Sequence, residues 1–278
     1  MRNRFTDELA VCGLNTIRAL SDVHPEKINR LFLREDRLPL FTGLCKQLAE
    51  RKRPYKLCED EELEKICKTP HHQGIVAMIY EPVIKGAEPE DIEEWAAKGK
   101  TGLLLCDIGN DLNLGAIIRS AAFFDASPVV LAGQNAAEEK ETSLKTEVLE
   151  KPQLSTAAYR SAEGGMEYVE FLSVRNPASF LRSASKNLTS IGADPRARIR
   201  IRDIPQILKE QKTPGRKSYS GSSNRPGIVL VIGNEEKGLS AEVKEQCSFL
   251  ARIPGTGVLE SLNAAQAATL FLQELYEC

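Results

Sequence analysis

The sequence predicts an α/β protein in which a mostly parallel sheet is covered by helices on both faces. Short apolar segments alternate with helical patterns along most of the 278 residues, and that alternation is typical of parallel sheets. Hydrophobic residues make up 42% of the chain and charged residues 27%. This ordinary balance excludes a collagen-like, low-complexity or mainly disordered chain. At about 150 residues per domain, the length predicts one or two domains.

Residues 1–82 are predicted to form a small α/β domain. Its helices are expected at Thr6–Leu20, Leu38–Arg51 and Asp60–Lys68. Its strands are expected at Ile28–Leu33, Tyr55–Cys58 and Ile75–Tyr80. Residues 83–100 are predicted to be a linker, because they contain proline and the acidic run EPEDIEEW. A short helix around Trp95 is expected there, with the indole as a packing anchor.

Residues 101–278 are predicted to form the larger domain. Its strands are expected at Gly102–Cys106, Val129–Leu131, Tyr168–Leu172, Thr189–Ala193 and Ile228–Ile232. Its helices are expected at Leu114–Phe124, Ser155–Ala162, Ala178–Lys186 and Ser261–Glu277. Residues 134–152 and 209–226 are polar, and we expect loosely held loops there. Ligands of parallel sheets bind at the carboxyl ends of the strands, so the segments that follow the strands are the candidates for chemistry.

The overall charge excludes a globally basic nucleic-acid coat protein, because 37 basic and 39 acidic residues leave a net charge of −2. Any contact with RNA must therefore come from a local patch. One candidate patch alternates arginine with small or apolar residues: Arg196, Arg198, Arg200 and Arg202. If this segment is extended, all four side chains point to one face. Contact with phosphate is one interpretation, and an edge strand that charge protects from aggregation is the other.

Composition also predicts a cytoplasmic protein without a membrane span. No apolar run approaches the roughly 18 residues that a spanning helix needs, and the N-terminal residues contain no apolar signal-peptide core. The seven cysteines are an odd number, which favours unpaired thiols in a reducing compartment. A zinc site at Cys58, Cys67, His71 and His72 is not expected, because no CxxC pair occurs and the two cysteines are better explained as core thiols.

Residues 107–124 form the first segment with chemical potential. A predicted strand ends before a polar turn, and a helix begins near Asn113. Gly115 and several alanines leave this helix nearly bare, so that another backbone can approach it closely. Arg119 is an unusual residue in such a helix. Taken alone, the segment fits an ordinary helix cap with a surface arginine equally well.

The second and third segments follow predicted strands later in the chain. Residues 228–239 run from an apolar strand into Gly233, then into acidic residues and Gly238, and glycine at a strand end lets a ligand reach the main chain. Residues 251–268 contain a Pro-Gly-x-Gly turn, then Ser261 as the predicted helix cap, with Asn263 expected to be buried in the first turn. Each segment alone also fits a plain structural joint. The dinucleotide pattern G-x-G-x-x-G is absent, so a nicotinamide enzyme is not favoured.

In this order and spacing, the three segments resemble the three motifs of the SpoU/TrmH family of SPOUT methyltransferases. The first motif, N-x-G-(x)3-R-(S/T), is matched by Asn113, Gly115, Arg119 and Ser120. The second, G-x-E-x-x-G-L, is matched by Gly233, Glu235, Gly238 and Leu239. The third, I-P-x-x-G-x-x-x-S-L-N, is matched by Ile253, Pro254, Gly257, Ser261, Leu262 and Asn263. Residues 156–165, TAAYRSAEGG, resemble the family's Ser/Ala/Gly-rich helix between the first two motifs.

Residues 1–82 resemble the family's L30e-like substrate-binding domain, through VCGLNTIRAL at 11–20 and HQGI at 72–75. The whole arrangement is similar to the YfiF-like branch. Some motif positions depart from the family's common residues: Glu236 stands for Gly, Gly255 for Met, and Ala264 and Ala265 for Val and Ser. None of these changes removes a polar residue assigned to catalysis.

The resemblance implies an enzyme that transfers a methyl group from S-adenosylmethionine to a ribose 2′-hydroxyl in structured RNA, either tRNA or rRNA. It implies a homodimer with a deep C-terminal trefoil knot and without metal. The implied catalytic residues are Asn113, Arg119, Glu235, Ser261 and Asn263. The implied cofactor-binding residues are Gly233, Asn234, Gly238, Leu239, Ile253, Pro254, Gly257, Ser261 and Leu262.

The family assigns a base-like role to its motif-one arginine, here Arg119. Because a guanidinium has a pKa above about 12, phosphate clamping and oxyanion stabilisation fit Arg119 better. Two alternatives stay open. Glu236 and the Ala264–Ala265 pair also fit an inactive scaffold that only binds RNA. A SPOUT enzyme that methylates a base nitrogen is the other alternative, although Asn113 with Arg119 favours ribose.

Overall fold

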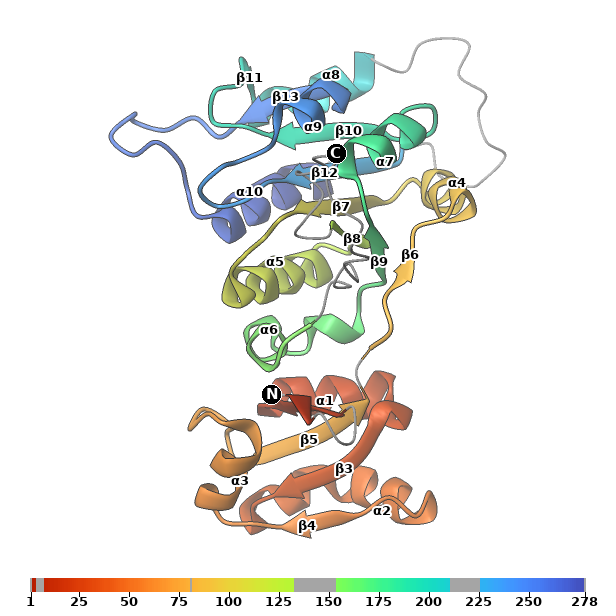
Figure 1. Cartoon of the computed structure of the whole chain (residues 1–278), viewed down its shortest axis with the longest axis vertical. Helices are drawn as coiled ribbons and strands as arrows, with labels where there is room; N and C mark the ends of the chain where they lie inside the picture. Colours follow the sequence, from red (N-terminus) through yellow and green to blue (C-terminus); the bar gives the residue numbers. More distant parts are fainter. Residues whose placement is uncertain (1, 4–7, 81, 133–153, 211–225, 278) are drawn as a thin grey trace, which may run out of the picture. The chain divides into compact units, whose positions relative to one another are not determined.

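Two sheets organise the chain, each in a compact unit of its own (Figure 1). The computed structural model describes all residues except 1, 4–7, 81, 133–153, 211–225 and 278. The first unit contains Met1–Val83, Asp111–Arg119 and Gln153–Tyr168. The second contains Ile84–Asn110, Ser120–Pro152 and Val169–Cys278. Most of the two polar stretches expected to be loops, 134–152 and 209–226, lies outside the described residues.

The sheet of the first unit has the strand order β1-β2-β5-β3-β4 among the described residues. Its strands are β1 (Arg2–Asn3), β2 (Glu8–Cys12), β3 (Ile28–Leu33), β4 (Tyr55–Leu57) and β5 (Ile75–Tyr80). Its helices are α1 (Leu14–Val23), α2 (Thr42–Glu50) and α3 (Asp60–Cys67), with short 3-10 helices η1 (Pro25–Lys27) and η2 (Glu35–Phe41). Strand β5 pairs antiparallel with β2 and β3, whereas β3 and β4 are parallel. The prediction of a small α/β fold is confirmed.

The predicted helix at Thr6–Leu20 is correct only from Leu14 onward. The segment contains strand β2, a turn at Gly13 and then helix α1. All five residues of β2 are buried, so the strand shows no alternation that would distinguish it from a buried helix. Gly13 has φ +105°, which a residue with a side chain rarely adopts, and it separates the two elements. The helix predicted from Leu38 also starts later, because η2 with its internal Pro39 precedes α2.

A segment from later in the chain is fastened to the first sheet. It contains helix α6 (Thr156–Ala162) and the 3-10 helix η3 (Gly165–Glu167). Thr156 Oγ1 donates to the carbonyl of Ala10 in β2 at 2.7 Å. Lys27 Nζ forms an ion pair of 2.6 Å with Glu167, whose side chain is almost completely buried. The first unit is therefore larger than residues 1–82.

The sheet of the second unit has the order β11-β13-β10-β12-β7-β8-β9-β6 among the described residues. Its strands are β6 (Lys85–Gly86), β7 (Thr101–Cys106), β8 (Val129–Ala132), β9 (Phe171–Val174), β10 (Thr189–Ala193), β11 (Ile199–Arg200), β12 (Ile228–Ile232) and β13 (Phe249–Arg252). Every neighbouring pair is parallel, so the predicted parallel sheet is confirmed. The strand predicted at Tyr168–Leu172 is shifted to Phe171–Val174.

Helices surround this second sheet and supply its core. They are α4 (Pro89–Lys98), α5 (Asp111–Phe123), α7 (Pro177–Ala184), α8 (Ile204–Glu210), α9 (Ala241–Gln246) and α10 (Ala264–Tyr276), with the 3-10 helix η4 (Ile201–Asp203). Helix α5 begins in the first unit and ends in the second. Apolar side chains from β7, β12, α7 and α9 meet in one buried cluster.

The predicted linker at 83–100 forms ordered structure. Strand β6 pairs with β9, and helix α4 confirms the expected short helix around Trp95. Trp95 is buried in the core cluster, and its Nε1 donates to the carbonyl of Lys100 at 2.9 Å. A Cβ on Gly102 would lie 2.4 Å from the indole. A glycine is therefore needed in β7, so that the strand can accommodate the tryptophan.

Buried cysteines support the interpretation as core thiols. Cys58 and Cys67 pack with Cys12 beneath the first sheet, and every cysteine that the structure describes has a free thiol. In the same described ranges, no three His, Cys, Asp or Glu side chains are grouped so that they could hold a metal ion. None of the described helices is both long and apolar enough to cross a membrane.

Candidate active site

Three loops follow neighbouring strands at one edge of the second sheet. Strands β7, β12, β10 and β13 lie side by side and are parallel, so their carboxyl ends share an edge (Figure 1). Residues 107–110 follow β7, residues 233–240 follow β12 and residues 253–263 follow β13. Ligands bind at this edge in open parallel sheets. The loops of the second and third motifs therefore lie where a ligand is expected.

The loop after β12 is folded tightly on itself. Asn234 O accepts from Gly238 N at 2.9 Å, and Asn234 Oδ1 accepts from the backbone N–H groups of Glu236 and Lys237 at 3.0 Å each. A Cβ on Gly233 would lie 2.4 Å from the carbonyl carbon of Gly238. Gly238 itself has φ +66°. Both motif glycines are thus required by the shape of the turn.

This loop also holds the one after β7. Asn234 Nδ2 donates to the carbonyl of Asp107 at 2.8 Å, and Gly109 N donates to Glu235 Oε2 at 3.3 Å. The Glu235 carboxylate is therefore held beside residues 107–110, the loop after β7. The side-chain amide of Asn234 shapes the loop, so a cofactor would meet the backbone of this residue. Leu239 is buried with Val243 in the core, and its side chain likewise supports the loop.

The loop after β13 exposes most of its residues. Ile253 is half-buried, whereas Pro254, Gly257, Ser261 and Leu262 are exposed. Val258 keeps 85% of its surface accessible and Leu259 keeps 78%, so two neighbouring apolar side chains are exposed together in this loop. Gly257 has φ +84°, and no heavy atom lies within 4 Å of where a Cβ would be. Open space therefore adjoins the main chain of this loop.

The start of helix α10 differs from the prediction. The helix begins at Ala264, and Asn263, not Ser261, is its cap, because Asn263 Oδ1 accepts from Ala265 N at 2.8 Å. Asn263 is exposed rather than buried. Asparagine is among the best residues at this position, because its short side chain satisfies an orphan N–H of the first turn. The cap places Asn263 at the surface, next to the loop after β13.

The helices of the first and third motifs touch at their polar residues. Ser120 Oγ lies 2.7 Å from Thr269 Oγ1 on α10. Thr269 Oγ1 also lies within hydrogen-bonding distance of the carbonyl of Ala265, at 2.8 Å, so the hydroxyl pair is tied to the backbone of α10. Ser120 of the first motif thus has a structural role.

The remaining first-motif residues belong to the first unit, on the opening turns of α5. A Cβ on Gly115 would lie 2.4 Å from the carbonyl oxygen of Ala158 in α6, so the expected close approach of another backbone is confirmed. Asn113 is half-buried. Arg119 has an exposed side chain and forms an ion pair of 3.3 Å with Glu163. Asn113 and Arg119 therefore lie in one unit, and Glu235, Ser261 and Asn263 in the other.

Glu163 is a residue that the sequence analysis did not single out. It ends helix α6 with φ +45°, in a conformation that normally favours glycine or asparagine. The sequence does contain an indication of its role in the run Glu163-Gly164-Gly165. An acidic residue occupies the helix end there, although two glycines follow directly.

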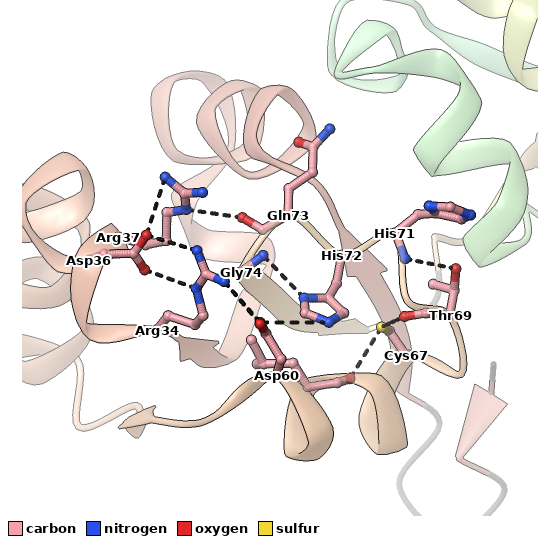
Figure 2. Close-up of polar contacts among 11 residues, drawn as sticks. Arg34, Asp36, Arg37, Asp60, Cys67, Thr69, His71, His72, Gln73 and Gly74 are labelled. Carbon is pink, nitrogen blue, oxygen red and sulfur yellow. Dashed lines mark hydrogen bonds and ion pairs between the residues drawn. The ribbon is translucent and has the colours of Figure 1, made fainter.

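The HQG turn of the first unit is closed by polar contacts (Figure 2). Gln73 Oε1 accepts from Leu14 N at 2.7 Å and so caps helix α1 from a distance. His72 Nδ1 accepts from Gly74 N at 3.1 Å, which places the proton of a neutral imidazole on Nε2, 4.0 Å from Asp60. The two segments that resemble the substrate-binding domain, 11–20 and 72–75, therefore meet at this turn.

Arginines complete the same turn. Arg34 makes paired contacts with both oxygens of Asp36 and of Asp60, at 2.8 to 3.2 Å, and these contacts lower the pKa of Asp36. Arg37 Nε donates to the carbonyl of Gln73 at 3.1 Å. Figure 2 shows the guanidinium of Arg34 between the two carboxylates. These charges serve the fold of the turn.

The four predicted RNA-binding arginines are all exposed, and Ala197, Ile199 and Ile201 between them are half-buried. The expected extended run is only partly correct. Ile199–Arg200 forms the edge strand β11, but Ile201–Asp203 turns into the 3-10 helix η4. Arg196 lies 3.0 Å from Glu260 in the loop after β13. The patch therefore borders the third motif.

A buried carboxylate supports this patch. Asp194 Oδ2 forms an ion pair of 2.7 Å with Lys244, and Asp194 Oδ1 accepts from Arg196 N at 2.8 Å. Burial acts to raise the pKa of Asp194, but the contacts with Lys244 and the Arg196 backbone outweigh it, and the pKa is lowered. Asp194 thus anchors the start of the arginine run.

Two protein families match the chain. The SpoU rRNA methylase family matches residues 100–273. The family described as RNA 2′-O ribose methyltransferase substrate binding matches residues 10–82.

Relatives and solved structures extend these matches. The chain is 28% identical to the 23S rRNA (guanosine-2′-O-)-methyltransferase RlmB of Acinetobacter baylyi, over 94% of both chains. It is also 28% identical to the uncharacterized tRNA/rRNA methyltransferase YfiF of Escherichia coli, over 99% of this chain and 69% of that one. An AdoMet-bound rRNA methyltransferase from Sinorhizobium meliloti has the same fold, with a TM-score of 0.69, 22% identity and coverage of 98% and 88% of the two chains.

Proposed function

The chain belongs to the SpoU rRNA methylase family, and we propose that it transfers a methyl group from S-adenosylmethionine to a ribose 2′-hydroxyl of a structured RNA. The observation that carries the proposal is the family match over residues 100–273, which includes all three motifs. The substrate-binding match at residues 10–82 supports RNA, tRNA or rRNA, as the partner.

The loops after β12 and β13 fit S-adenosylmethionine. Gly238, Gly255 and Gly257 have no heavy atom within 4 Å of a Cβ position, so a ligand can reach the main chain beside them. Exposed apolar side chains such as Leu262 and Val258 adjoin the same loop. The holding residues are then Gly233, Asn234, Gly238, Leu239, Ile253, Pro254, Gly257, Ser261 and Leu262. When bound, the cofactor supplies a methyl group that its sulfonium has already activated.

The residues of the chain then mainly have to align the acceptor oxygen. The Arg119 guanidinium clamps an RNA phosphate and stabilises negative charge that develops on the 2′-oxygen. The family motifs also assign Asn113, Glu235, Ser261 and Asn263 to the reaction. Their exposure or half-exposure leaves them accessible to a substrate.

RNA also needs cationic contacts outside the reaction centre. Arg196, Arg198, Arg200 and Arg202 are exposed beside the third motif, which supports contact with phosphates. The double variant Arg198→Ala with Arg200→Ala is expected to weaken RNA binding by about tenfold, and the salt slope should fall by about 1 for each lost phosphate contact. Nitrocellulose filter binding across a salt series measures both. An unchanged slope would leave β11 as a charged edge strand only.

A second copy of the chain is part of the proposal. Aromatic side chains at or just after the ends of α5 and α10 contact one another in series, with Phe123 5.0 Å from Phe124 and Phe124 5.8 Å from Tyr276 between ring centres. Phe123 nevertheless keeps 81% of its surface exposed, which supports a covered interface. We propose a cytoplasmic homodimer with the family's deep knot. Phe123→Lys should lower the mass measured by light scattering to that of a monomer.

Radiolabelled methyl transfer tests the main proposal. The purified protein is mixed with methyl-labelled S-adenosylmethionine and total RNA, and 2′-O-methylation is mapped on all stable RNAs with and without the protein. Label is expected at one or a few ribose positions. An RNA-binding scaffold would instead retain RNA without transfer, with the same affinity in Asn113→Ala. Absence of cofactor binding in calorimetry would overturn the methyltransferase proposal.

A further inference from the structure

Glu163 occupies an unfavourable backbone conformation at the end of helix α6. Its φ of +45° and ψ of +46° lie in the left-handed region, which is rare and strained for a residue with a long side chain. Gly164 follows immediately and also has positive φ. Glycine is favoured at a helix end with this conformation, so the presence of a glutamate at position 163 needs an explanation.

The corner formed by Glu163 and Gly164 is packed against helix α1. A Cβ on Gly164 would lie 2.8 Å from the Cβ of Ala19 and 2.9 Å from the carbonyl oxygen of Asn15. The backbone of the corner therefore cannot shift toward α1. The base of the Glu163 side chain is held in place by this packing.

One carboxylate oxygen of Glu163 receives two partners. Asn15 Nδ2 donates to Glu163 Oε2 at 3.2 Å, and Arg119 Nη2 lies 3.3 Å from the same oxygen. Asn15 belongs to helix α1 of the first unit, and Arg119 belongs to the first motif. Glu163 is thus a direct link between the substrate-binding region and a motif residue.

The spacing on helix α5 explains why Arg119 reaches this carboxylate. Residues four apart lie on the same face of a helix, so Arg119 shares a face with Gly115. Gly115 is where the backbones of α5 and α6 approach most closely, with a Cβ position 2.6 Å from the Cβ of Ser161. Ser161 Oγ also donates to the carbonyl of Leu112 at 2.8 Å. Close packing at Gly115 therefore brings the next turn of α5 to the end of α6.

We propose that Glu163 is a positioning residue that orients the guanidinium of Arg119 for the RNA, and that Asn15 in turn orients Glu163. This inference rests on the proposed methyl transfer. The side chains of Arg119 and Glu163 are 58% and 42% exposed, and ion pairs this exposed contribute little to stability. We therefore expect the pair to fix the direction of the Arg119 guanidinium rather than to stabilise the fold. A guanidinium has five N–H donors, so binding to one carboxylate oxygen is compatible with binding to a phosphate.

Kinetics of four variants test the inference. Glu163→Ala is expected to lower kcat about tenfold, because a small misplacement of an aligned group costs up to about a hundredfold. Asn15→Ala should lower kcat about threefold, and the double variant should match Glu163→Ala, because Asn15 acts through Glu163. Glu163→Gln keeps an acceptor oxygen and should recover most of the loss. The KM for RNA and the Kd for S-adenosylmethionine should change less than about twofold. Glu94→Ala, which breaks the exposed pair with Lys98 on α4, is the matched control and should leave kcat unchanged.

A spectroscopic readout separates this inference from the proposed function. The Arg119 Nε–H resonance, assigned with Arg119→Lys, is expected to shift in both Glu163→Ala and Asn15→Ala without RNA or cofactor. If the native protein transfers no methyl group but the resonance shifts, the proposed function fails and the positioning contact stands. If transfer occurs and Glu163→Ala keeps native kcat, the inference is overturned. A lower KM for RNA with unchanged kcat would also overturn it, because Glu163 would then compete with the RNA phosphate.

Discussion

The HQG turn of the first unit and the motif loops of the second unit use polar side chains in opposite ways. In the HQG turn, Arg34 is paired with two carboxylates and Gln73 caps a helix. In the loop after β13, polar and apolar side chains alike are exposed beside glycines that border open space. The difference indicates that the polar groups of the HQG turn bind to one another, whereas the loop after β13 leaves its groups accessible to a ligand.

The comparison leads to separable experimental signatures. Residues that the fold uses should change stability and leave chemistry intact. Residues that face a ligand should change chemistry and leave stability intact. Substitutions in the two regions therefore test this difference.

Arg119→Ala should have the largest effect. Loss of a charge-stabilising donor in an active site lowers the rate by about 10²- to 10³-fold, so methyl transfer should fall below detection. Because Arg119 is exposed and its ion pair is weak, the melting temperature, the mass in solution and the Kd for S-adenosylmethionine should stay native. Single-turnover transfer assays and calorimetry measure these. Arg182→Ala, on the exposed face of α7, is the control, and native activity in Arg119→Ala would remove Arg119 from the site.

Gly233→Ala should act on the cofactor. The new Cβ would lie 2.4 Å from the backbone of Gly238, and backbone cannot move aside as a flexible side chain does. Overpacking of this kind costs about 1–3 kcal/mol, which corresponds to a rise of roughly 10- to 100-fold in the Kd for S-adenosylmethionine if the loop shifts. Gly43→Ala is the matched control, because no atom lies within 4 Å of its Cβ position in α2. Native affinity in Gly233→Ala would separate this loop from the cofactor.

Asp194→Asn tests whether a buried charge in the second unit supports the stability of the fold, as the polar residues of the HQG turn do in the first unit. Its pKa is lowered in the folded state, so its stabilisation is present above the pKa of the unfolded chain, near 4, and is lost as the pH falls through the folded pKa. Loss of the carboxylate should cost about 2 kcal/mol at pH 7. Urea unfolding at pH 7 and pH 3 measures the difference, which should shrink at the lower pH. A difference that stays constant with pH would contradict the ion pair with Lys244.

Gln73→Ala should have the smallest effect. It removes the cap on the first N–H of α1, and a lost cap costs about 1 kcal/mol. Chemical unfolding should show this loss, while kcat and the Kd for S-adenosylmethionine stay native. A selective loss of methyl transfer would break the comparison, because the HQG turn would then contact the substrate. Gln47→Ala on the exposed face of α2 serves as the control.

Much of the second sheet could be predicted because buried parallel strands read as continuous apolar runs. Strands β7 and β12 are the clearest examples. The same property made β2 hard to recognise, because its five buried residues read as a continuation of the apolar pattern of helix α1. Strand β6 has only two residues, and no local pattern of that length can reveal that β9 lies beside it.

The candidate site was predictable as motifs but not as contacts. The positions of Gly233 and Gly238 agree with the tight turn that the structure shows. In contrast, the helix cap was assigned to Ser261 although Asn263 provides it, because both residue types cap well and only the backbone distinguishes them. Glu163 was missed because its partners, Asn15 and Arg119, are distant in sequence.

The pairing of β12 between β7 and β10 has a consequence for biosynthesis. Thr101 pairs with Ile228, and β10 joins the opposite side of β12. During translation, β7 therefore emerges long before the strand that will cover its edge, and an uncovered apolar edge invites aggregation. The central pairing is of high contact order, which slows folding. The edge of β7 that β12 covers is therefore expected to be vulnerable to aggregation while the chain is being synthesised.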